Sequence, residues 1–138
     1  QHIRRHRATS NICSNETLIA LMGAMHMALL GPEGLEKLAT RIFSSTSKTL
    51  DAVSSIPGVD LVNPGGCFFR EFAIRLPGQA NKALESMYSD GVIGGISLGK
   101  WWNEMSDCIL VGCDEGTTES DISALVKSIE NWIGGASE

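Results

Sequence analysis

Several features that would define a function are missing from this 138-residue chain. Only three histidines occur, and none follows His26, so a serine nucleophile in the second half would have no histidine base after it. The four cysteines form no Cys-x-x-Cys pair, and no Cys/His spacing matches a zinc site. The formal net charge of −5 argues against a general nucleic-acid-binding protein, so we expect no nucleic-acid partner.

Long apolar runs are also missing. The longest mainly apolar stretch covers residues 18–30, and thirteen residues are too few to cross a bilayer, so we expect no membrane span. The cysteines have apolar neighbours in the sequence, and a free cysteine in such surroundings packs as a small core residue. Unpaired core cysteines favour a protein of a reducing compartment over a secreted, disulfide-bonded protein. We therefore expect a cytoplasmic protein. Because the chain begins at Gln1 rather than Met, we expect it to be part of a longer polypeptide.

What the chain does have is a basic segment followed by small polar residues at its start. Three arginines and three hydrogen-bonding residues stand there in close succession: Arg4, Arg5, Arg7, Thr9, Ser10 and Asn11. Cations and hydrogen-bond donors at the start of a helix are the chemistry that holds a phosphate group. A helix cap behind a solvated basic tail also explains the segment, and composition alone slightly favours it. Three polar side chains in a row are, however, more than one cap requires.

Two long helices are predicted next. The first covers residues 11–30, is apolar nearly all round and ends at Gly31 and Pro32. Such a helix must be covered on more than one side. Either another domain or subunit covers it, or it is the central core helix of this domain. The second covers residues 32–55. Its predicted buried face carries five apolar residues: Leu35, Leu38, Ile42, Leu50 and Val53.

The remainder of the chain reads as short strands and amphipathic helices. In chain order we expect a strand at 59–62, a strand at 67–76 with its even-numbered residues on one face, a helix at 79–89, a glycine-rich strand and loop at 92–99, a strand at 108–113 and a helix capped by Thr117 or Thr118. This order predicts an α/β domain of the two-layer α+β type. Its small, mostly antiparallel sheet has helices on one face and is preceded by long helices.

Two motifs in the second half have ordinary structural explanations. Residues 94–100 match a P-loop and a nucleophile elbow in part, but Trp101 stands where a P-loop needs Ser or Thr, and no histidine follows Ser97. A tight loop, or a close approach of the backbone to another element, is the better interpretation. For Trp101 and Trp102, a packed corner or a subunit contact is favoured over a ligand platform.

The remaining polar candidates carry weaker signals. Arg70 and Arg75 either grip a carboxylate ligand or form ordinary charge pairs, and both interpretations stay open. His26 fits a core or interface histidine better than a catalytic one. No lysine has the desolvated surroundings of a Schiff-base lysine, since all lie on polar helix faces or in a loop: Lys37, Lys48, Lys82, Lys100 and Lys127.

Four stretches of the chain carry a resemblance to one enzyme family: residues 1–5 (QHIRR), 8–13 (ATSNIC), 29–35 (LLGPEGL) and 94–99 (GGISLG). Together, and in this order, they resemble the C-terminal part of glycine decarboxylase, the P-protein of the glycine cleavage system. The resemblance extends over essentially the whole chain. It is closest to the first subunit of the split form, in which two homologous chains replace one.

The resemblance implies the small C-terminal domain of a fold-type-I pyridoxal phosphate enzyme. Residues 1–31 would be a phosphate-contact segment and interface helix, residues 32–138 the small domain, and a large cofactor-binding domain would precede them. The implied reaction decarboxylates glycine on pyridoxal phosphate and passes the aminomethyl group to a lipoyl carrier protein. The resemblance places the cofactor on a lysine of the partner, a second P-protein subunit, in a heterotetramer.

The same resemblance implies a role for the polar residues near the start. Thr9 first, then Ser10 and Asn11, would contact the cofactor phosphate bound by the partner subunit, and this chain alone would be inactive. Two other functions remain open. One is the small domain of another fold-type-I enzyme, such as a cysteine desulfurase, which would need a cofactor lysine upstream. The other is a non-catalytic small-molecule-binding or oligomerisation domain.

Overall fold

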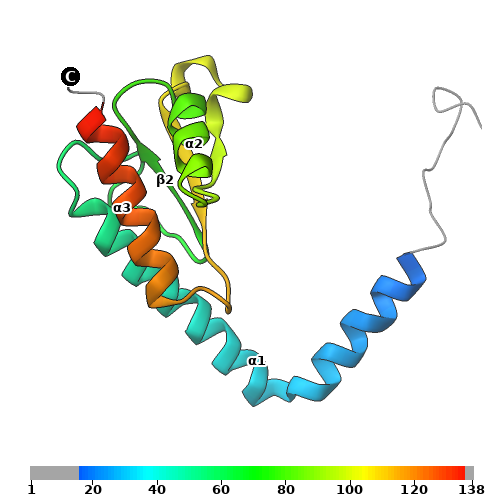
Figure 1. Ribbon diagram of the computed structural model, residues 1–138. Helices are drawn as coiled ribbons and strands as arrows, with labels where there is room; N and C mark the ends of the chain where they lie inside the picture. Colours follow the sequence, from blue (N-terminus) through cyan, green and yellow to red (C-terminus); the bar gives the residue numbers. More distant parts are fainter. Residues whose placement is uncertain (1–15, 136–138) are drawn as a thin grey trace, which may run out of the picture. The chain divides into compact units, whose positions relative to one another are not determined.

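The computed structural model describes residues 16–135 of the chain (Figure 1). They fall into two compact units, with the boundary between Lys37 and Leu38. The first unit holds the beginning of helix α1 (Glu16–Ser54). The second unit holds the rest of α1, a four-stranded sheet and two further α-helices.

Helix α1 joins the two predicted helices without a loop between them. Gly31 has φ 62° and ψ −177°, a backbone conformation outside the helical region that glycine adopts at little cost. Pro32 follows and lacks an N–H group, so it can begin a new helical segment without losing a hydrogen bond. The first predicted helix therefore ends at Gly31, and the second helical segment begins directly after it at Pro32. The predicted start at residue 11 lies outside the described residues.

The first segment of α1 exposes its apolar side chains. Seven large apolar residues have relative exposures between 52% and 86%: Leu18, Ile19, Leu21, Met22, Met25, Met27 and Leu29. An 18-residue window of α1 has a mean hydropathy of 1.4, enough by length and composition to cross a membrane. The expectation of no membrane span rested on the shorter apolar run alone. The core helix of a soluble protein meets the same criterion. The hydropathy of this window therefore does not by itself assign α1 to a membrane or to a protein core.

The predicted buried face of the second segment of α1 is exposed only at its start, since the three predicted residues between Leu35 and Val53 are half-buried. Val53 is fully buried, whereas Leu35 is 39% exposed. Thr46 and Thr49 are buried, which the apolar pattern missed. Each threonine hydroxyl donates a hydrogen bond of 2.8 Å to the carbonyl oxygen four residues earlier. Since this bond satisfies the hydroxyl inside the helix, a threonine can lie on a buried face.

The sheet of the second unit is antiparallel throughout. Its strands are β1 (Asp60–Leu61), β2 (Glu71–Arg75), β3 (Ile96–Ser97) and β4 (Cys108–Gly112), in the order β1-β2-β4-β3. All three strand pairs are antiparallel, and the central strands β2 and β4 pair over five residues. Each strand is shorter than predicted. Phe68, expected within the second strand, instead stacks on Phe43 with ring centroids 5.6 Å apart.

Helices α2 (Ala80–Ser89) and α3 (Glu119–Gly135) lie side by side over one face of the sheet (Figure 1). Ile74 of β2 and Ile109 of β4 are neighbours on that face and are 1% and 0% exposed. Met87 of α2 and Ile129 of α3 are fully buried in the same core. The predicted fold class, with a small antiparallel sheet and helices on one face, is confirmed.

Helix α3 begins with a reciprocal cap that selects Thr118 from the two predicted residues. The Asp121 N–H donates to the Thr118 hydroxyl oxygen at 3.2 Å, and the Thr118 N–H donates to the Asp121 carboxylate at 2.8 Å. Hydrogen bonds from the hydroxyl and the N–H of Thr118 hold the pKa of Asp121 below its ordinary value. The local sequence therefore determines where this helix starts.

Candidate functional site

The predicted phosphate contacts lie outside the described residues. Thr9, Ser10 and Asn11, like the arginines before them, precede Glu16, where the description of α1 begins. Their contact with a phosphate group stays a prediction.

The lysines of the chain do not form a covalent cofactor site within the described residues. A lysine that holds pyridoxal phosphate through its amino group is expected to be desolvated. All five lysines are exposed: Lys37, Lys48, Lys82, Lys100 and Lys127. This agrees with the interpretation of their sequence positions.

The two arginines of the predicted second strand are both in charge pairs. Nη1 of Arg75 donates hydrogen bonds to both carboxylate oxygens of Asp107. Nε of Arg70 lies 3.7 Å from the Glu71 carboxylate in a loose pair with both side chains about half exposed. Of the two interpretations left open by the sequence, the structure supports ordinary charge pairs.

Asp107 of this pair also contacts a buried cysteine, Cys108. Arg75 stands opposite Cys108 in the β2–β4 register, and the Cys108 thiol donates to Asp107 at 3.2 Å. Burial and the Asp107 carboxylate raise the pKa of Cys108 to about 11. Burial of Asp107 acts to raise its own pKa, but hydrogen bonds from Cys108 and Arg75 outweigh it and lower that pKa. The hydrogen bond to Asp107 raises the pKa of Arg75. Cys108 is therefore held as a thiol and is a poor nucleophile.

We expect Cys67 to react with iodoacetamide at about pH 8 while Cys108 and Cys113 stay unmodified. Cys67 is exposed, contrary to the expectation that it is a core residue, whereas the other two are buried. Peptide mass spectrometry after a timed reaction measures the difference. The same reaction in urea should label Cys67, Cys108 and Cys113 alike. Equal labelling of Cys67 and Cys108 in the folded chain would contradict both the burial and the raised pKa.

The glycine-rich stretch brings its backbone against neighbouring elements, as predicted. Gly95 has φ +135°, and a Cβ atom built on it would lie 2.2 Å from the carbonyl oxygen of Leu110. A Cβ atom on Gly94 would lie 2.2 Å from Sδ of Met87. Ser97 is buried in β3 opposite Ile109, not displayed on an exposed strand-to-helix turn. These positions support the close-approach interpretation and exclude a nucleophile elbow here.

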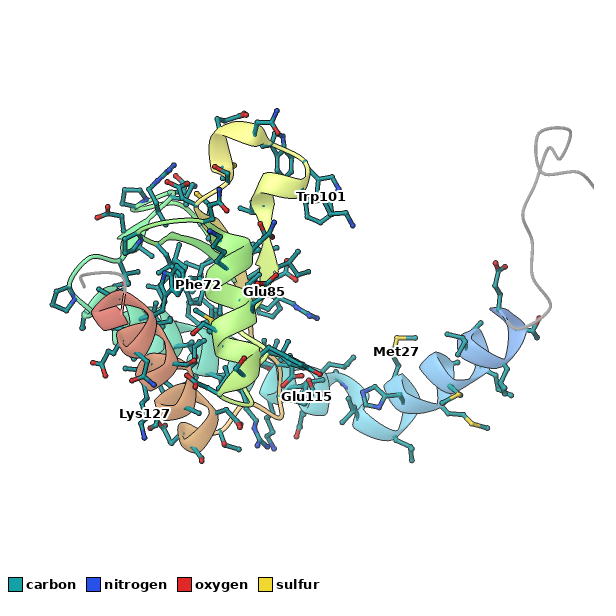
Figure 2. All side chains as sticks on the ribbon, turned by 45° about the horizontal axis from the view of Figure 1, so that its top comes forward. Met27, Phe72, Glu85, Trp101, Glu115 and Lys127 are labelled. Atoms are coloured by element: carbon teal, nitrogen blue, oxygen red, sulfur yellow. The ribbon has the colours of Figure 1, made fainter. Side chains whose placement is uncertain are left out.

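The two tryptophans lie at the surface. Trp101 and Trp102 are 56% and 50% exposed, with ring centroids 6.2 Å apart. Lys100 extends over the Trp101 ring, its Nζ 5.2 Å from the ring centroid. Figure 2 shows Trp101 on the turn that follows β3, away from Phe72 in the core. Their exposure contradicts a packed corner within the second unit, and it leaves the subunit contact and the ligand platform as the two open interpretations.

Two of the hollows in the second unit lie beside the motifs of the sequence analysis. One, of about 510 Å³, is lined by apolar residues: Leu98, Trp101, Trp102, Met105 and Leu110. The other, of about 250 Å³, lies between the glycine-rich loop and the start of α3, and Cys113 and Thr49 are among its lining residues. The Cys113 thiol donates to the Thr49 hydroxyl at 3.4 Å. Within residues 16–135, no three His, Cys, Asp or Glu side chains gather closely enough to hold a metal ion.

Comparison with solved structures defines the class of protein first. A P-protein of the glycine cleavage system, solved in an inhibitor-bound form, superposes with a TM-score of 0.78 and 32% identity, over 92% of this chain and 28% of that chain. A NifS-like protein from Rickettsia africae superposes with a TM-score of 0.60 and 17% identity, over 72% of this chain and 30% of that chain. The fold is that found in fold-type-I pyridoxal phosphate enzymes.

The family follows from the sequence comparisons. The family model described as glycine cleavage system P-protein matches residues 1–129, and the chain belongs to this family. A relative from Caulobacter sp. (strain K31), named "Probable glycine dehydrogenase (decarboxylating) subunit 1", is 41% identical over 135 residues, which are 96% of this chain and 29% of that protein. The predicted family is confirmed. The chain spans less than a third of the length of this curated relative.

Proposed function

We propose that this chain is part of a glycine dehydrogenase of the glycine cleavage system, which decarboxylates glycine and passes the aminomethyl group to a lipoyl carrier protein. The match of residues 1–129 to the P-protein family carries this proposal. The curated relative from Caulobacter is named for the same activity. The proposed activity belongs to the longer protein, and we place that protein in the cytoplasm.

The proposed cofactor is pyridoxal phosphate, which when bound supplies the electron sink for decarboxylation. The described residues do not fit its covalent attachment, because all five lysines of the chain are exposed. We therefore assign the cofactor lysine to a second P-protein subunit in a heterotetramer. On this proposal the chain completes the site of its partner and has no activity alone.

The chain's own contribution is a phosphate contact and an interface. Thr9 first, then Ser10 and Asn11, would donate hydrogen bonds to the cofactor phosphate, with the preceding arginines supplying positive charge. The exposed apolar segment of α1 that follows supports an interface, since a helix that is apolar all round needs cover on several sides. On this division, residues 1–31 act as phosphate-contact segment and interface helix, and residues 32–138 as the small domain.

We expect exchange of carbon between glycine and bicarbonate to require both the full-length parent chain and its partner subunit. The assay also contains pyridoxal phosphate and the lipoyl carrier protein. In Thr9→Ala, loss of one hydrogen bond to the phosphate should weaken cofactor retention by about tenfold and lower exchange with it. Ser120→Ala is the matched control, because Ser120 is an exposed hydroxyl residue of α3, outside the segment proposed to contact the phosphate and the partner.

Each other outcome removes a stated part of the proposal. Full exchange by the parent chain without a partner would contradict the shared site. Equal exchange in Thr9→Ala and Ser120→Ala would reduce the basic segment to a helix cap. No exchange with both chains present would contradict the glycine dehydrogenase assignment and favour a binding or oligomerisation domain.

A further inference from the structure

We propose that a hollow at the end of helix α2 binds a small amino acid in its zwitterionic form. We call it the charged hollow, and six residues line it: Asp90, Val92, Ala124, Lys127, Ser128 and Asn131. They come from the end of α2, from the loop that follows it and from α3. The proposed function uses none of them, so this site is independent of the glycine dehydrogenase assignment.

The Asp90 carboxylate is held in position with one oxygen left open. Its Oδ2 accepts a hydrogen bond of 2.8 Å from the Ser128 hydroxyl and one of 3.4 Å from the Asn131 side-chain amide. Ser128 is 2% exposed, so the packing of α3 fixes its hydroxyl. No hydrogen bond within residues 16–135 uses Oδ1 of Asp90. The carboxylate is therefore oriented in advance, and its second oxygen can accept a donor from a ligand.

Asp90 also stands at a helix end where a cation is favoured. It is the C-terminal cap of α2, and its backbone N–H donates to the carbonyl oxygens of Ser86 and Met87, each at 3.1 Å. The carbonyl groups at this end of a helix carry a partial negative charge, which adds to that of the carboxylate. No cationic side chain among residues 16–135 forms an ion pair with Asp90. An ammonium group from a ligand would offset this negative charge.

Lys127 brings the opposite charge to the same hollow. It lies on α3 between Ala124 and Asn131, at the spacings of three and four residues that place side chains on one face of a helix. Its side chain is exposed, and it belongs to no ion pair in the described part of the chain. Asp90 and Lys127 thus line one hollow without pairing with each other. A molecule that carries both an ammonium group and a carboxylate can bridge the two.

The size and lining of the charged hollow indicate the class of ligand. Its volume is about 330 Å³, and ligand pockets begin at about 300 Å³, so the ligand is small. Val92 and the short side chain of Ala124 form the apolar part of the lining and leave room for carbon atoms. A polyamine would meet the like charge of Lys127, and a phosphate would meet that of Asp90. A zwitterion with a short side chain avoids both repulsions.

Saturation-transfer difference NMR of L-alanine with the full-length parent chain and its partner subunit tests the charged hollow. Asp90→Asn removes the charge but keeps an oxygen that accepts the Ser128 hydrogen bond, and we expect it to weaken binding by about tenfold or more. Lys127→Gln should have the same effect. Glu130→Gln and Lys82→Gln are the matched controls, because both remove an exposed charge from α3 or α2 outside the hollow. They should leave L-alanine binding unchanged.

Competition separates a zwitterion site from a simple charge site. Methylamine carries only the ammonium group and acetate only the carboxylate, so each should displace L-alanine about tenfold less well than L-serine does. Equal displacement by methylamine or acetate would overturn the proposal.

Two further outcomes would also overturn the proposal. Equal L-alanine binding in Asp90→Asn, Lys127→Gln and the controls would locate the amino acid elsewhere, for example at the glycine site. Absence of a saturable signal would show that the hollow has no affinity for an amino acid. Circular dichroism checks the fold of each variant, and Lys127→Gln, at an exposed position, gives the result if Asp90→Asn does not fold. Binding needs no turnover, so a failed glycine–bicarbonate exchange bears on the proposed function alone.

Discussion

Gly95→Ala is expected to destabilise the second unit by about 3 to 5 kcal/mol. Two costs add at this position. At φ +135°, a residue with a side chain is strained, and its Cβ atom would lie 2.2 Å from the Leu110 carbonyl oxygen and 2.8 Å from the Ile109 side chain. The carbonyl belongs to the central strand β4 and cannot move without disturbing the sheet. Urea unfolding followed by far-ultraviolet circular dichroism measures the loss.

Gly91→Ala is the matched control for this variant. Gly91 also has a positive φ, +81°, but a Cβ atom there would meet nothing within 4 Å. Backbone strain alone should cost about 1 kcal/mol at that position. The difference between the two variants therefore contains the steric contact with β4 and the greater backbone strain at φ +135°. An equal loss of stability in both would show that the close approach at Gly95 has no energetic importance.

Ile109→Ala is expected to cost about 4 kcal/mol, because it removes a side chain from the centre of the core. Ile109 is 0% exposed and belongs to the core cluster shared by the sheet and the helices. Truncation loses the transfer free energy of the side chain and leaves a cavity that β4, paired on both sides, cannot close. The free energy of unfolding from urea titration measures this cost.

Ile93→Ala provides the comparison at the same residue type. Ile93 is 88% exposed in the loop after α2, so its truncation should change the free energy of unfolding by less than about 0.5 kcal/mol. A loss below about 1 kcal/mol for Ile109→Ala would contradict a tightly packed core between β4 and the helices.

Local patterns predicted the elements of the second unit well. The alternation around Phe72 and Ile74 identified the buried face of β2, and the expected cap at Thr117 or Thr118 predicted the start of α3 to within one residue. Both signals depend on residues a few positions apart, so they can be recognised in the sequence without knowledge of the fold. The end of a strand is different, because it depends on where its partner stops. Phe68 continues the alternation of the second strand yet packs on Phe43 instead of joining the ladder.

The buried polar residues of α1 were missed for a related reason. Thr46 and Thr49 interrupt the apolar pattern, and a count of apolar residues places them outside. Their hydroxyls are satisfied by carbonyl oxygens of the same helix, which removes most of the cost of burial. A reading that allowed threonine on the buried face would have found them.

The sequence by itself determined the family and the fold class. Both follow from motifs and periodicities, which are properties of neighbouring residues. Only the tertiary structure decided the charge partner of Arg75, the glycine requirement at Gly95 and the exposure of Trp101. Asp107 lies thirty-two positions from Arg75 and reaches it through the packing of distant elements. Such contacts depend on how separate strands align, and no local pattern specifies that alignment.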